Sequence, residues 1–140
     1  MKTSIILSSY NGAEYIEEQL NSLLTQTRPA DEVLFFDDCS SDNTPALIES
    51  FIQKNNLTTW TLYRNKENIG WRKNFIHGMS CCHGDIIFPC DQDDIWLPEK
   101  VQKMTDVMEQ HEEINLLVSS YTAFYPNGTK ETLTPPPSKI

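Results

Sequence analysis

Short apolar runs alternate with longer stretches of helical periodicity along this chain, and that alternation limits the folds open to it. Strand-length runs separated by amphipathic helices are typical of strand-helix-strand units, which assemble on a parallel sheet. The runs that predict strands cover residues 4–8, 32–36, 59–64, 85–88 and 115–119. The sequence therefore predicts an α/β fold with a mostly parallel central sheet.

The stretches between these runs carry apolar side chains at the three- and four-residue spacing of one helical face. The four stripes lie in residues 16–24, 47–52, 71–82 and 97–108. The first, second and fourth strand runs are apolar without alternation, as expected of strands covered on both faces. We therefore expect three layers, α/β/α, with these three strands buried at the centre of the sheet.

The composition fits one small domain and argues against a nucleic-acid surface. With 140 residues, of which 39% are hydrophobic, the chain is long enough for one core and too short for two ordinary domains. The net charge of -9 opposes binding to nucleic-acid phosphates, which needs clustered Lys and Arg. No apolar run approaches the roughly 20 residues of a membrane helix. We expect a protein of the cytoplasm or of the cytoplasmic face of the membrane, which would bind phosphates through a metal ion or backbone amides.

Polar and acidic residues follow three of the predicted strands. The segments are residues 9–12 after the first strand, 37–42 after the second and 89–94 after the fourth. Ligands of open parallel sheets bind beyond the carboxyl ends of the strands, so these segments should meet at one edge. Carboxylate oxygens are the ligands that Mg²⁺ or Mn²⁺ prefers, and three carboxylates come from Asp91, Asp93 and Asp94. A metal bound by one or two carboxylates keeps positions open for phosphate oxygens.

A purely structural interpretation exists for each of these acidic residues. Asp94 could cap the following helix, and Asp37 or Asp38 could form a turn, as Asp after a strand commonly does. For any one of these residues taken alone, that interpretation is the better one. The concentration of all three segments at one sheet edge favours a binding site.

Four ordered segments of the chain together resemble the family 2 glycosyltransferases of GT-A fold. They are residues 4–12 (SIILSSYNG), 32–42 (EVLFFDDCSSD), 68–74 (NIGWRKN) and 91–100 (DQDDIWLPEK), the last of which is similar to the family's DxD segment. The sequence DQDDIW within the last segment is similar to that of the bacterial branch of the family that includes rhamnosyltransferases of surface polysaccharide assembly. The family usually has glycine after its paired aspartates, where this chain has Cys39, so the backbone there must tolerate a side chain.

The resemblance implies roles for individual residues. Tyr10 and Asp38 would contact the donor's base, with Asp38 accepting a hydrogen bond from the pyrimidine N–H that uracil and thymine both offer. Asp93 would bind Mn²⁺ or Mg²⁺ directly, with Asp91 as the second ligand candidate. A cation at Arg72 or Lys73 could reach the diphosphate, and we take Lys73. The donor-binding residues expected on this basis are Ser9, Tyr10, Asn11, Asp38, Lys73, Asp91 and Asp94.

The same resemblance implies an inverting transfer from a UDP- or dTDP-sugar to a saccharide or lipid-linked acceptor. The family's catalytic base is an aspartate from a later segment, and this sequence has no aspartate beyond Asp106. We therefore expect residues 1–125 to be a truncated GT-A donor-binding subdomain without a catalytic residue of its own. Residues 126–140 would be a tail leading to a missing acceptor-binding part.

An incomplete sheet would leave an exposed edge, which predicts self-association.

Two other functions remain open for the same residues. A non-catalytic nucleotide-binding module would keep every residue discussed. A receiver-like signalling domain also carries acidic residues after its strands, but it places its acidic pair after the first strand, where this chain has Tyr10 and Asn11.

Overall fold

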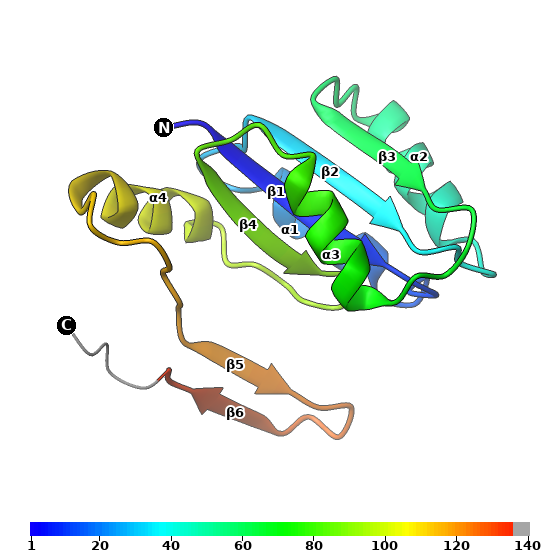
Figure 1. The fold of residues 1–140 in the computed structure, drawn as a ribbon. Coiled ribbons are helices and arrows are strands. Elements are labelled where there is room, and N and C mark those ends of the chain that lie inside the picture. Colours follow the sequence, from blue (N-terminus) through cyan, green and yellow to red (C-terminus); the bar gives the residue numbers. More distant parts are fainter. Residues whose placement is uncertain (136–140) are drawn as a thin grey trace.

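Alternating strands and helices make up the computed structural model of the chain, which describes residues 1–135. Figure 1 shows the elements in chain order. They are β1 (Thr3–Ser9), α1 (Ile16–Leu24), β2 (Glu32–Asp37), α2 (Thr44–Lys54), β3 (Trp60–Arg64), α3 (Trp71–Ser80), β4 (Ile86–Asp91), α4 (Lys100–Gln110), β5 (Tyr121–Phe124) and β6 (Lys130–Leu133). The first four strands and all four helices lie where the apolar patterns predict them.

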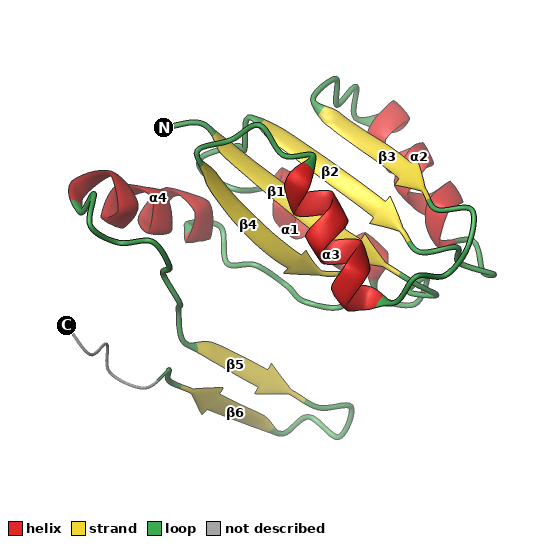
Figure 2. Cartoon of the chain, in the orientation of Figure 1, coloured by secondary structure: helices red, strands yellow, loops and turns green. Residues whose placement is uncertain are grey.

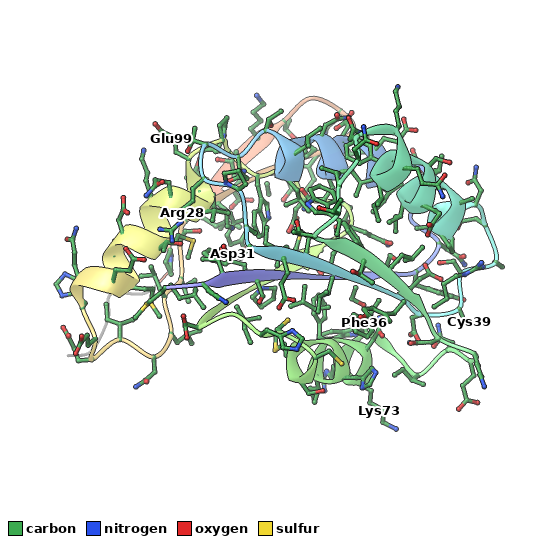
Figure 3. All side chains as sticks on the ribbon, turned by 90° about the horizontal axis from the view of Figure 1, so that it is seen from above. Arg28, Asp31, Phe36, Cys39, Lys73 and Glu99 are labelled. Atoms are coloured by element: carbon green, nitrogen blue, oxygen red, sulfur yellow. The ribbon has the colours of Figure 1, made fainter. Side chains whose placement is uncertain are left out.

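The central sheet has the strand order β3-β2-β1-β4, and every neighbouring pair in it is parallel. Helix α3 lies on one face of this sheet, and α1 and α2 lie on the other (Figure 2). Helix α4 packs on the same side as α1 and α2, as the view along the sheet in Figure 3 shows. The predicted three-layer α/β/α architecture is confirmed.

The core follows from the alternation of side chains along β1 and β2. Ile5, Leu7 and Phe35 point to the side of α1, α2 and α4 and form the larger cluster. Ile6 and Phe36 point the other way and pack under α3. Both faces of the two central strands are therefore buried.

Strand β4 differs from the prediction that it is covered on both faces. Ile86, Phe88 and Cys90 are buried in the larger cluster, whereas Ile87 and Pro89 alternate with them and are exposed. The reason is the position of β4 at the edge of the sheet, where α3 covers its outer face incompletely. Proline is tolerated in such a strand because its missing N–H matters least at an edge.

The outer edge of β4 has no partner strand within residues 1–135. This is the edge through which the predicted self-association would occur. Self-association stays a prediction, and the sedimentation behaviour of the chain in solution would test it.

The fifth predicted strand, residues 115–119, is wrong. This segment is irregular, with Leu116 81% and Val118 60% exposed, because it finds no neighbouring strand in the described residues to pair its backbone groups. Strands β5 and β6 follow it instead and form an antiparallel hairpin apart from the main sheet (Figure 1). The boundary predicted between residues 125 and 126 falls in the turn of this hairpin, so the expected tail contains β6; the last part of that tail, from residue 136, lies outside the described residues.

Among residues 1–135, none of the helices has the length and apolar character needed to cross a membrane.

Candidate functional site

The loops that follow β1, β2 and β4 meet at one edge of the sheet, because parallel strands present their carboxyl ends together (Figure 1). The register places Ser8 of β1 beside Asp91 of β4. A hollow of about 310 Å³ opens at this edge. Its lining residues are Ser8, Tyr10, Trp71, Phe75, Asp91, Gln92 and Asp93. We call this hollow the edge pocket.

Three residues singled out from the sequence line the edge pocket, namely Tyr10, Asp91 and Asp93. Tyr10 is 48% exposed, so its side chain is accessible to a ligand. Asp91 and Asp93 belong to the acidic loop, residues 91–94, and both are exposed. Asp94 lies in the same turn, with its backbone N 3.5 Å from the carbonyl oxygen of Asp91, but it is outside the pocket lining.

Partial loss of solvent and repulsion between like charges both act on the carboxylates of the acidic loop. Loss of solvent around its carboxylate, and next the charge of Asp93, raise the pKa of Asp91. Loss of solvent, followed by the charges of Asp91 and Asp93, raises the pKa of Asp94, and nearby Lys100 partly offsets this. A positively charged ligand at this loop would therefore relieve an existing strain between like charges.

Buried amide and hydroxyl groups on α1 hold the acidic loop in place. Gln19 is fully buried, and its Nε2 donates hydrogen bonds to the carbonyl oxygen of Asp91 at 2.8 Å and to Sγ of Cys90 at 2.9 Å. The hydroxyl of Ser22 accepts a hydrogen bond from the backbone N–H of Trp96 at 3.1 Å. These contacts fix both the beginning of the loop and the segment that follows it.

Replacing Gln19 with leucine should lower the free energy of unfolding by about 1–3 kcal/mol, because the partly buried carbonyl of Asp91 loses its amide donor. Urea unfolding monitored by circular dichroism measures the change. The matched control is Gln53→Leu on the exposed face of α2, which should have little effect. Equal losses for the two variants would show that Gln19 does not support the loop.

Asp37 and Ser9 join β2 to β1 in the interior. Both are buried, and Oγ of Ser9 donates a hydrogen bond to Asp37 Oδ1 at 2.8 Å. The backbone N–H and the hydroxyl of Ser40 donate to the same carboxylate at 2.9 and 2.7 Å. Ser9, which we expected to bind the donor, therefore faces Asp37 in the interior, whereas its neighbour Ser8 lines the edge pocket.

Asp38 organises the loop that leads into α3. It is 2% exposed, and its carboxylate accepts hydrogen bonds from the backbone N–H groups of Ile69 at 2.8 Å and Gly70 at 2.9 Å and from Nδ2 of Asn65 at 3.0 Å. These three donors occupy most of the roughly four acceptor positions of the carboxylate, which leaves little room for a base N–H. The base contact implied for Asp38 stays a prediction, and in this structure the residue positions a loop.

Asn11 also connects two loops at this edge. Its Oδ1 accepts a hydrogen bond from the backbone N–H of Ser41 at 2.8 Å, and its own N–H donates to Oγ of Ser40 at 2.9 Å. Cys39 lies between these loops with a φ of 61°, in the left-handed region that favours glycine. The backbone at Cys39 thus keeps the conformation that would suit a glycine and carries a side chain in it.

Lys73 is not among the residues that line the edge pocket, and the diphosphate contact implied for it stays a prediction. Its side chain points away from the sheet (Figure 3), and it is exposed. One residue along a helix turns the side chain by about 100°, so Arg72 and Lys73 cannot face the same way. Arg72 lines a second, largely apolar hollow of about 410 Å³ next to the edge pocket, with its guanidinium carbon 5.1 Å from the centre of the Trp71 ring.

Four lining residues had no predicted role in binding, namely Ser8, Trp71, Phe75 and Gln92. Two signals in the sequence could have identified some of them. Alternation along β1 puts Ser8 on the same face as Ile6 and Ser4, opposite to Ser9. Trp71 and Phe75 are four residues apart and so share one face of α3.

The chain matches known proteins over nearly all of its length. The family model described as "Glycosyl transferase family 2" matches residues 4–138. The poly(ribitol-phosphate) beta-N-acetylglucosaminyltransferase TarS of Staphylococcus aureus is 32% identical over 120 residues, which are 84% of this chain and 21% of TarS. An uncharacterized glycosyltransferase of Nostoc sp. is 28% identical over 117 residues, which are 84% of this chain and 36% of that protein. The chain thus spans less than half the length of either relative.

Solved structures show the same fold. The crystal structure of residues 1–349 of S. aureus TarS in complex with UDP-GlcNAc has a TM-score of 0.72 and 30% sequence identity, covering 80% of this chain and 32% of that one. The mannosyltransferase PcManGT from Pyrobaculum calidifontis, in complex with GDP-Man and Mn²⁺, has a TM-score of 0.73 and 22% identity, covering 90% of this chain and 36% of that one. The α/β/α layers described above are therefore those of GT-A glycosyltransferases.

Proposed function

The chain belongs to glycosyltransferase family 2, and we propose that it is the donor-binding part of an enzyme that transfers a sugar from a nucleoside diphosphate. The observation that carries the proposal is the edge pocket, where an accessible tyrosine and two aspartates line one hollow at the carboxyl edge of the sheet. TarS, which is 30% identical to this chain in the aligned structure, was solved in complex with UDP-GlcNAc. This similarity favours a uridine or thymidine diphosphate sugar as the donor.

In this proposal the base of the nucleotide lies against Tyr10. Trp71, which is 65% exposed, lines the same hollow from α3, so it supplies a second aromatic wall. Flat rings suit this task because they bury a base or sugar face at low cost in side-chain entropy. Asp38 takes part by holding the loop before α3, and hence the start of that helix, in position.

A divalent cation fits the residues of the acidic loop. Within the described part of the chain, no three His, Cys, Asp or Glu side chains come together closely enough to hold a metal by themselves. The edge pocket offers the two carboxylates of Asp91 and Asp93, whose mutual repulsion a cation would remove. Mg²⁺ and Mn²⁺ accept one or two carboxylates when phosphate oxygens complete the shell.

Such a cation, when bound, would neutralise the charge that develops on the diphosphate as the bond to the sugar breaks. The chain's own residues then have separate tasks. Asp91 and Asp93 hold the metal, Asp94 adds negative charge beside it, and Tyr10 orients the nucleotide. Arg72, which occupies the neighbouring hollow, is our candidate for a cation near the diphosphate in place of Lys73.

Transfer with inversion also needs a base that accepts a proton from the acceptor hydroxyl as that oxygen attacks the sugar. Of the carboxylates in residues 1–135, the two that line the edge pocket are those assigned to the metal. We therefore place the base and the saccharide or lipid-linked acceptor site in a part of the longer enzyme outside these residues. A non-catalytic nucleotide-binding module would use the same pocket and lack only that base.

Calorimetric titration of the chain with UDP, dTDP and GDP, each with and without Mn²⁺, tests the proposal. We expect the pyrimidine diphosphates to bind more tightly than GDP, and only when Mn²⁺ is present. Equal binding of all three nucleotides would contradict the base contacts. Binding that is unchanged by EDTA would contradict the metal.

A further inference from the structure

The side chain of Gln92 connects the two loops that form the edge pocket. Gln92 belongs to the acidic loop, where it lies between Asp91 and Asp93. Its Oε1 accepts a hydrogen bond from the backbone N–H of Tyr10 at 2.9 Å, and its Nε2 donates one to the backbone carbonyl of Tyr10 at 3.0 Å. A single amide side chain thus satisfies both backbone groups of the residue that carries the pocket's tyrosine ring.

This pair of bonds replaces contacts that the sheet no longer provides. The parallel pairing of β1 with β4 ends where Ser8 lies beside Asp91, and both strands stop within one residue of that point. Beyond it, the backbone of Tyr10 has no strand beside it on the β4 side. The side-chain amide of Gln92 pairs with the backbone of Tyr10 as a backbone amide of a neighbouring strand would. It thereby extends the hydrogen bonding between the two segments beyond the ends of the strands.

Gly12 provides an independent sign that this link is built into the fold. A Cβ atom placed on Gly12 would collide with the terminal Oε1, Cδ and Nε2 atoms of Gln92. The φ angle of Gly12 is not in the left-handed region, so the backbone conformation alone does not require glycine. The absence of a side chain at Gly12 instead makes room for the amide of Gln92.

We propose that Gln92 is a positioning residue that locks the Tyr10 loop to the acidic loop, so that the tyrosine ring and the aspartates act on one ligand together. The effect on ligand binding rests on the proposed function. The nucleotide is held at its base end by Tyr10 and at its diphosphate end by Asp91 and Asp93. If the two loops move independently, binding must first fix their relative position, and affinity falls by that cost.

Three variants test this role. Gln92→Ala removes both hydrogen bonds, Gly12→Ala pushes the amide away from Tyr10, and the double variant combines the two changes. Each single variant should bind UDP in the presence of Mn²⁺ about tenfold more weakly, the order expected for losing a two-point hydrogen-bonded contact. The double variant should also lose about tenfold rather than about a hundredfold, because both changes break the same contact.

Amide hydrogen exchange provides a readout that needs no ligand. The N–H of Tyr10 donates to Gln92 Oε1, so its exchange should be faster by about tenfold or more in either single variant. Gln53→Ala, an exposed amide on α2, is the control and should change neither exchange nor affinity.

The proposal is wrong if Gln92→Ala keeps both the UDP affinity and the Tyr10 protection of the wild type, or if the two single losses multiply in the double variant. A wild-type chain that binds no nucleoside diphosphate would instead reject the proposed function. In that case two measurements without ligand still decide whether Gln92 locks the loops. They are the amide exchange of Tyr10 and the free energies of unfolding of the two single variants and the double variant, whose losses should not add.

Discussion

Replacing Asp93 with asparagine should weaken Mn²⁺-dependent binding of UDP by about 100-fold or more, because the metal loses a charged ligand in the edge pocket. Removing a residue that only supports a metal ligand lowers metal affinity or activity by about 10- to 100-fold, so removing a ligand itself should lower it at least as much. The side chain keeps its shape and is exposed, so the fold should be unaffected. Calorimetry with and without Mn²⁺ measures the loss.

The matched control for this change is Glu112→Gln, which removes one negative charge from the exposed segment after α4. It should leave UDP binding unchanged. If the two variants weakened binding equally, the effect of Asp93 would come from the net charge of the protein, and the metal assignment would be wrong.

The largest loss of stability should come from Phe35→Ala. Phe35 is fully buried in the larger core cluster, and its ring centre lies 5.5 Å from that of Trp60. Removing such a ring leaves a cavity and typically costs about 3–5 kcal/mol. Because small domains have a total stability of about 5–15 kcal/mol, the variant should be partly unfolded or close to it. Urea unfolding measures the change.

Phe124→Ala offers the same chemical change at a different place. Phe124 is 56% exposed on the β5–β6 hairpin, which packs apart from the main sheet, so its loss should cost about 0.5 kcal/mol or less. Comparable costs for the two variants would contradict the position of the core between the central sheet and helices α1, α2 and α4.

The sequence could predict the parts of the fold that depend on local patterns. The apolar runs of β1 and β2 and the helical stripes of α1 to α4 each identify an element without reference to the rest of the chain. The edge that carries Tyr10 and the acidic loop follows from the same reasoning, because parallel strands bring their carboxyl ends together. These predictions needed no knowledge of which strands are neighbours.

The errors arose where the outcome depends on distant partners. Residues 115–119 have the composition of a strand, but the described structure offers no strand to pair with them. The exposed face of β4 follows from its place at the edge of the sheet, which its own sequence does not reveal.

Individual side chains in the site show the same limit. Ser9 and Asp38 have the chemistry of binding residues, but their side chains form hydrogen bonds with residues 28 to 32 positions away in the chain. The role of Gln92 depends on Tyr10, which is 82 positions distant in the chain. The direction of the Lys73 side chain was open for a different reason, because one step along a helix turns the side chain by about 100°.

The position of a bound metal ion shows directly whether the edge pocket is the donor site. Mn²⁺ is paramagnetic and broadens the NMR signals of nearby nuclei, so amide spectra of the chain with UDP and either Mn²⁺ or Mg²⁺ locate the ion. With UDP and Mn²⁺ together, we expect the signals of residues 8–12 and 91–94 and the indole signal of Trp71 to disappear, while those of the β5–β6 hairpin persist. Broadening centred on any other part of the chain, or none at all in the presence of both ligands, would contradict the proposed donor site.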